Sequence, residues 1–116
     1  MRFCPWYPIA EARDRAPAGE GVFQLRLASG LLDYPRGKSA MVHYAHAANV
    51  AAAVETWAEA HGEPASAREQ LLCRHLIEND PATDLAQFHA KLSDEFVRRF
   101  GAIPGLGPSC LDPRSR

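Results

Sequence analysis

The stretch GVFQLRLAS, from Gly21 to Ser29, alternates hydrophobic and polar residues. Phe23 and Leu25 fall on one side of an extended chain, and Gln24 falls on the other. This period of two predicts a half-buried strand. A second apolar run, AMVHY, follows after Ser-Gly and Pro-Arg-Gly turn signals, so the two runs predict an antiparallel pair joined by a long connection.

A helical period follows the second strand. It predicts a helix from Asn49 to His61, with Asn49 as the N-cap and Gly62 as the stop. The helix has a hydrophobic stripe that we expect to be buried, made of Val50, Val54, Trp57 and Ala58.

The second half of the chain predicts a third strand and a final helix. QLLCRHLIEN, at residues 70–79, fits a strand, with a helix as the competing interpretation. Asp80-Pro81 is typical of a helix start, because proline suits the first helical position. The final helix is expected from about 82 to 100, with Gly101 as its stop. Its apolar stripe consists of Leu85, Phe88, Leu92, Phe96 and Phe100.

The predicted order is ββαβα, which indicates a small α+β domain with a three-stranded, mainly antiparallel sheet flanked by helices. We expect this domain to span residues 17–107. Residues 1–16 combine aromatic residues with prolines and predict an extended arm with a short helix. Trp6 and Tyr7 in this arm either mark a partner surface or pack on the domain itself. Residues 108–116 are expected to form a flexible tail.

Composition narrows the classes of protein that fit. A chain of 116 residues has room for one small domain. The net charge of −1 excludes a strongly basic protein overall but permits a local basic face. No apolar run approaches the roughly 20 residues of a membrane span, and no signal-peptide core is present, so we expect a cytoplasmic protein without a membrane partner. Three widely spaced cysteines and no CxxC indicate reduced thiols and no structural zinc site.

Several short motifs follow one another along the chain in a fixed order. Gly21-Val22-Phe23 opens the first strand, His43-Tyr44-Ala45 lies in the second, and Asn49-Val50 begins the helix. The closing stretch DLAQFHAKLSDEFVRRFGAIPGLG completes the series. Over roughly residues 17–107, this series resembles the GIY-YIG nuclease family. The resemblance implies the ββαβα fold and, in active members, cleavage of phosphodiester bonds.

The chain departs from the family pattern at the positions that carry catalysis. The resemblance implies a tyrosine hydroxyl, an arginine, a metal-binding glutamate and a terminal asparagine. Phe23 stands at the tyrosine of the first motif, and His43 and Ala45 stand at the first tyrosine and the glycine of the second. The stretch Ala51–Ala53 has no cation where the arginine is implied. His89 falls at or near the glutamate position, and Gly107 falls at the asparagine position. Phosphodiester hydrolysis needs an oriented nucleophile, a cation and a metal ligand, and losing one charge stabiliser can cost about 10²–10³ in rate. Conventional nuclease activity is therefore not expected.

The favoured interpretation is a binding module for nucleic acid or for another protein. The alternative is a metal-dependent endonuclease or hydrolase with a rebuilt site, in which His43 and His89 act as an acid–base pair or His89 binds metal. Tyr44 would contribute a hydroxyl, although strand alternation points it away from His43. A divalent metal is expected only in this enzymatic alternative. Both histidines could equally be ordinary, partly buried and hydrogen-bonded side chains, and a structural or oligomer-forming protein is a third interpretation.

Basic side chains near the first hairpin are the candidate nucleic-acid contacts. Arg26, Arg36 and Lys38 could contact a phosphate backbone as a modest patch. The competing interpretation is a solvated hairpin without a ligand. Cys73, in an apolar strand, is expected to be an inert buried cysteine.

Overall fold

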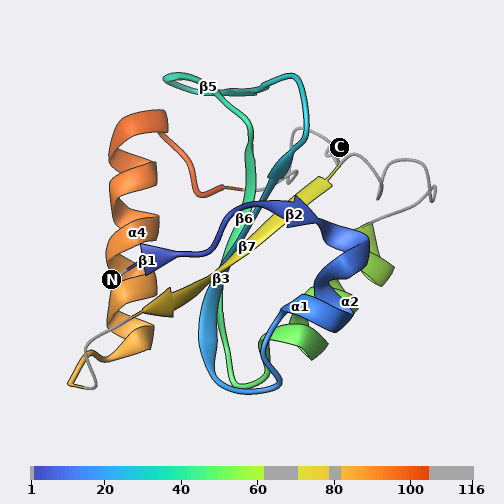
Figure 1. The fold of residues 1–116 in the computed structure, drawn as a ribbon. Coiled ribbons are helices and arrows are strands. Elements are labelled where there is room, and N and C mark those ends of the chain that lie inside the picture. Colours follow the sequence, from blue (N-terminus) through green and yellow to red (C-terminus); the bar gives the residue numbers. More distant parts are fainter. Residues whose placement is uncertain (1, 62–70, 79–81, 105–116) are drawn as a thin grey trace.

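The computed structural model of the protein describes residues 2–61, 71–78 and 82–104. Within these ranges the chain is a small mixed α+β fold with a mainly antiparallel sheet (Figure 1). Its strands are β1 (Arg2–Phe3), β2 (Tyr7–Pro8), β3 (Gly21–Leu27), β4 (Leu32–Tyr34), β5 (Gly37–Ser39), β6 (Met41–Ala47) and β7 (Leu71–Glu78). Its helical elements are the 3-10 turn η1 (Ile9–Glu11) and the helices α1 (Ala12–Arg15), α2 (Val50–His61) and α4 (Leu85–Phe100).

The main sheet has β3 at its centre, paired antiparallel with β6 on one side and β7 on the other. The series β3, β6, α2, β7 and α4 confirms the predicted ββαβα order. The N-terminal arm adds two short strands that the three-stranded prediction lacked, because β1 and β2 both pair with β7.

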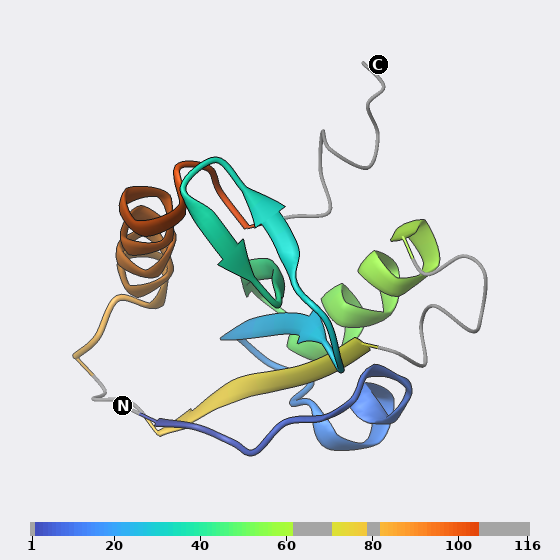
Figure 2. The same cartoon turned by 90° about the horizontal axis from the view of Figure 1, so that it is seen from above.

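Helices lie on both sides of this sheet, with α1 and α2 on one side and α4 on the other (Figures 1 and 2). The prediction that β3 is half-buried is therefore wrong, because each of its residues from Gly21 to Leu25 is buried. Strand alternation sends Phe23 and Leu25 toward α2, where they join the core with Trp57.

The opposite face of the sheet looks toward α4. The strand register places Gln24 opposite both Tyr44 and Arg74, so these three side chains share a face. The Tyr44 ring packs edge-on against Phe96 of α4, with 5.5 Å between ring centroids. The two faces are called the α2 face and the α4 face below.

The connection between β3 and β6 forms a separate two-stranded hairpin, β4–β5. Tyr34 anchors it to α4, with its ring 5.0 Å from Phe96 and 5.8 Å from Phe100. The Tyr34 hydroxyl also donates to the backbone oxygen of Met41. These contacts tie the hairpin to the end of α4.

The helix ends follow capping chemistry. Asn49 caps α2 as predicted, since its side-chain oxygen accepts from the Ala52 N–H at 3.0 Å. Helix α4 begins at Leu85, three residues later than predicted, because Asp84 is its N-cap and accepts from the Gln87 N–H at 3.1 Å. Gly101 ends α4 in the left-handed conformation, as predicted. The predicted stop at Gly62, the Asp80-Pro81 start and the tail at 108–116 lie outside the described residues.

Candidate functional site

A groove on the α2 face is lined by Phe23 and His43, two of the residues singled out from the sequence. It has a volume of about 560 Å³ and lies between β6 and α2. The His43 ring stands between Phe23 and Trp57, at centroid distances of 5.8 and 5.6 Å. Among the described residues that line the groove, none is a carboxylate, a lysine or an arginine. At its rim, His46 Nε2 lies 2.7 Å from a Glu20 carboxylate oxygen, so this histidine is engaged in an ion pair when protonated.

The second predicted histidine lies on the other side of the sheet. His89 Nε2 is 3.2 Å from the backbone oxygen of Tyr44 and 3.4 Å from the Ser93 hydroxyl. The structure thus brings His89 and Tyr44 together on the α4 face and leaves His43 on the α2 face. The proposed convergence of His43 and His89 is not found, because α4 packs on the face away from α2. Within the described ranges, no three His, Cys, Asp or Glu side chains come together to hold a metal ion.

Two of the three predicted nucleic-acid contacts, both in the hairpin, have partners within the protein. Arg36 Nη1 donates to the backbone oxygen of Arg98 at 3.0 Å, and Lys38 Nζ lies 3.6 Å from an Asp33 oxygen. The third, Arg26, stacks with the N-terminal arm instead. The three cations therefore do not form one patch on the hairpin.

Arg26 belongs to a different group of side chains, on the α4 face. Its guanidinium carbon lies 5.0 Å from the centroid of the Trp6 ring. The Arg74 guanidinium lies 4.5 Å from Trp6 and 4.7 Å from Phe3. Each distance is within the range of a cation–π interaction. The arm therefore holds two aromatic rings against two arginines of neighbouring strands.

A buried polar side chain orients one arginine of this pair, Arg74. Gln24, only 3% exposed, accepts a hydrogen bond from Arg74 Nε at 2.7 Å. Burial lowers the pKa of the Arg74 guanidinium, and the like charge of Arg26 acts in the same direction. Arg26 Nε is buried and has no hydrogen-bond partner in the described part of the chain. Such an unsatisfied donor costs about 1–3 kcal/mol.

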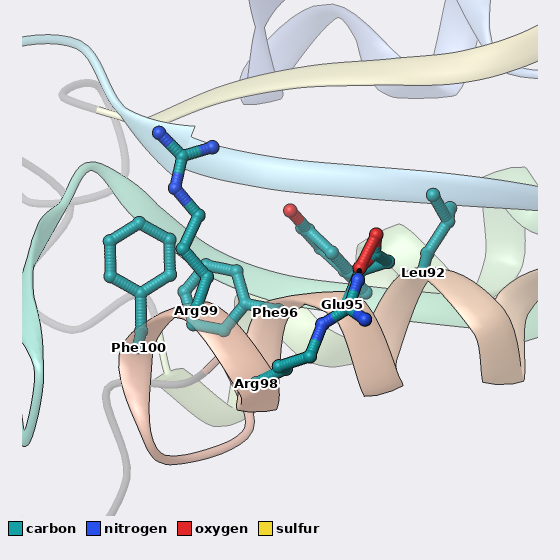
Figure 3. Close-up of a pocket in the computed structure, with 7 residues that line it drawn as sticks. Leu92, Glu95, Phe96, Arg98, Arg99 and Phe100 are labelled. Carbon is teal, nitrogen blue, oxygen red and sulfur yellow. Dashed lines mark ion pairs between the residues drawn. The ribbon is translucent and has the colours of Figure 1, made fainter.

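The group extends into a pocket of about 490 Å³ beside α4 (Figure 3). Tyr44 lines it together with residues of α4, namely Leu92, Glu95, Phe96, Arg98, Arg99 and Phe100. Arg99 reaches from α4 toward the sheet, whereas Arg98 pairs with Glu95 on the helix surface (Figure 3). Burial raises the pKa of Tyr44, and the charges of Arg74 and Arg99 partly oppose that rise. Tyr44 therefore lies close enough to Arg74 of β7 and Arg99 of α4 for both charges to act on its hydroxyl.

We call this group the arginine–aromatic surface, and it consists of Phe3, Trp6, Arg26, Tyr44, Arg74 and Arg99. Elsewhere, cations are neutralised by nearby carboxylates, as in the pairs Arg13–Glu55, Arg15–Glu11, Lys38–Asp33 and Arg98–Glu95. Among the described residues, no carboxylate pairs with Arg26, Arg74 or Arg99. The surface therefore concentrates positive charge on a protein whose net charge is −1.

A second polar cluster fastens the arm to β7. The Tyr7 hydroxyl lies 3.0 Å from His75 Nδ1, and Cys4 Sγ lies 3.6 Å from the same nitrogen. Cys73 is fully buried and 3.5 Å from the Tyr7 hydroxyl, and burial raises the pKa of its thiol to about 11. The prediction that Cys73 is buried is confirmed. This cluster supports the position of Trp6, which lies in the arm between Cys4 and Tyr7.

No protein-family model matches the chain, and no curated protein matches it. Within the described residues, none of the helices is long and apolar enough to cross a membrane. The fold and the surface define the class as a small α+β protein with a partly exposed cationic and aromatic face. Sequence reasoning singled out Arg26 and Tyr44 but missed Arg74. The available signal was an arginine inside the apolar strand LLCRHLIE.

Proposed function

We propose that the protein is a nucleic-acid-binding module on a GIY-YIG-like scaffold that lacks a hydrolytic site. The observation that carries this function is the set of three arginines, Arg26, Arg74 and Arg99, each stacked on an aromatic ring and without a carboxylate partner in the described part of the chain. Guanidinium groups bind phosphates through several parallel donors, and aromatic rings stack on bases.

The residues of the α2 groove support the proposal that the protein lacks a hydrolytic site. In place of a tyrosine hydroxyl near an attacking water, it presents the Phe23 ring and the His43 imidazole. The stretch Ala51–Ala53, where the resemblance implies an arginine to stabilise the developing phosphate charge, has no cation, and Ala52 and Ala53 line the groove. Among the described residues, the groove lining thus offers no carboxylate, lysine or arginine for these roles.

Nucleic acid fits the surface better than an acidic protein segment does. An acidic peptide would satisfy the guanidinium groups but gains little from Phe3 and Trp6 beside them. A nucleotide offers both an anion and a flat ring, so it uses both kinds of side chain.

The test compares oligonucleotide affinity by fluorescence anisotropy at fixed salt. The variant Arg26→Gln with Arg74→Gln should bind at least about tenfold more weakly, because charged hydrogen bonds contribute roughly 1.5–3 kcal/mol each. The matched control is Arg13→Gln with Arg15→Gln, which makes the same change in net charge. Both of these arginines lie on α1, and each is paired with a glutamate. Equal losses in the two double variants, or no binding by the wild type, would overturn the proposal.

Cleavage is tested separately with supercoiled DNA and magnesium, manganese or zinc. The proposal predicts binding without nicking. Metal-dependent nicking that disappears in His43→Ala would show that the α2 groove is catalytic and would contradict the proposal that the protein lacks a hydrolytic site.

A further inference from the structure

We infer that the ligand of the arginine–aromatic surface is single-stranded nucleic acid, with a base stacked at Trp6 and the backbone held by Arg26, Arg74 and Arg99. This inference rests on the proposed function and adds the strandedness of the ligand. It starts from the observation that the Trp6 ring contacts the guanidinium groups of both Arg26 and Arg74, and that Arg74 also contacts Phe3.

The aromatic part of the surface favours unpaired bases. Trp6 and Phe3 are each partly exposed while they contact Arg74. In a duplex the faces of the bases are already stacked on one another, and protein rings gain little from them. Unpaired bases offer their faces, and stacking on a side-chain ring strengthens binding regardless of base identity.

The shape of the site also favours a single strand. Duplex recognition commonly uses a helix or a two-stranded ribbon placed in the major groove. Here the arginines rise from the face of a sheet, from β3 and β7, and α4 borders that face (Figure 1). The β4–β5 hairpin is not a substitute, because Arg36 binds the Arg98 backbone oxygen and Lys38 pairs with Asp33.

The pocket beside α4 extends the site along a strand. Its volume of about 490 Å³ lies within the roughly 300–1,000 Å³ of small-molecule pockets. Arg99 and the Tyr44 hydroxyl supply polar contacts there, and Phe100 supplies a ring. A flexible strand can place one nucleotide at Trp6 and a neighbouring one in this pocket, whereas a stiff duplex cannot follow both.

The experiment measures four probes at one salt concentration: a 12-nucleotide oligo-dT, a 12-nucleotide oligo-rU, a 12-base-pair duplex and a 12-residue poly-glutamate. We expect both single strands to bind at least about tenfold more tightly than the duplex. Trp6→Ala should weaken single-strand binding about tenfold and leave duplex binding nearly unchanged. Trp6→Phe should retain most of the affinity, because it keeps a ring.

Tryptophan fluorescence supplies a second readout, with Trp6 left in place. Trp57 is 9% exposed in the core, so quenching by oligo-dT in a Trp57→Phe variant reports stacking on Trp6. Equal affinity for duplex and single strand, or an equal loss on both in Trp6→Ala, overturns this inference and leaves the proposed function standing. Absence of binding to all nucleic acids, or equal binding of poly-glutamate, overturns the proposed function as well.

Discussion

His75 is the residue at which the arm and the sheet meet through ionisable groups. Its Nδ1 lies 3.0 Å from the Tyr7 hydroxyl and 3.6 Å from Cys4 Sγ. Burial lowers the pKa of His75, so the folded protein favours the neutral imidazole. The hydroxyl of Tyr7 can donate to a neutral Nδ1, and the same contact holds Trp6 near its arginines.

This environment predicts a stability that decreases in mild acid. Below the ordinary histidine pKa of about 6.5, the unfolded chain takes up a proton that the folded chain resists. The contribution of His75 is therefore present above that pH and is lost progressively as the pH falls toward the lowered folded pKa. Urea unfolding from pH 7.5 to 5 should show a smaller dependence on pH in His75→Gln than in the wild type. Tyr7→Phe, which keeps the buried imidazole, should retain the dependence; parallel curves for wild type and His75→Gln would contradict the prediction.

Individual residues show what a sequence can and cannot reveal about a site. Alternation along β6 correctly separated His43 from Tyr44, because neighbouring strand residues point to opposite faces. It could not place His89, whose partner is a backbone oxygen 45 residues away. It could not assign Arg74 to a surface either, since the rings that cover this arginine belong to the N-terminal arm. Pairing between distant segments leaves no local pattern.

Among the elements, the contact between β3 and α2 explains the glycine that opens the first motif. A Cβ atom at Gly21 would lie 2.9 Å from Val50 Cγ2, which is closer than van der Waals contact allows. Val50 is the first residue of α2 and is fully buried. The glycine therefore permits close approach of strand and helix at the end of the α2 groove.

Gly21→Ala should destabilise the fold by about 1–3 kcal/mol, the usual cost of an overpacked core. Adding Val50→Ala removes the clashing methyl group, so the two changes should couple and the double variant should lose less than the sum of the single losses. Denaturant unfolding measures each free energy. Gly19→Ala is the matched control, because a Cβ there meets nothing within 4 Å. Equal stabilities of the Gly21 and Gly19 variants would refute the close-approach explanation.

Element prediction succeeded where periodicity was strong and failed where tertiary contacts decide. The buried stripe of α2 and the strand at β7 follow from local patterns and are confirmed. The strand β3 was expected to expose one face, but helices on both sides and the arm cover both. The start of α4 was misplaced because Asp84 caps the helix, four residues after the Asp80-Pro81 signal. Competing caps of the same residue type cannot be ranked without the packing around them.

For the molecule as a whole, the distribution of charge bears more on nucleic-acid binding than the net charge does. A net charge of −1 and a sequence pI near 6.5 give no expectation of strong nucleic-acid binding. Ion pairs at Arg13, Arg15 and Lys38 neutralise cations elsewhere, whereas two arginines on adjacent strands of the α4 face form no ion pair with a carboxylate of the described residues. The short-range field at that face is therefore positive while the long-range field is weak.

This distribution predicts a modest salt dependence of binding. Three phosphate contacts on a single strand should give a slope of about −2 for log K against log salt, since each contact contributes roughly −0.7. Arg74→Gln or Arg99→Gln should each flatten the slope by about 0.7, because one cation no longer displaces a counterion. Lys38→Gln is the control and should leave the slope unchanged, since Asp33 already neutralises this lysine. If Lys38→Gln changed the slope and Arg74→Gln did not, the phosphate contacts would lie on the hairpin, where the sequence alone had placed them.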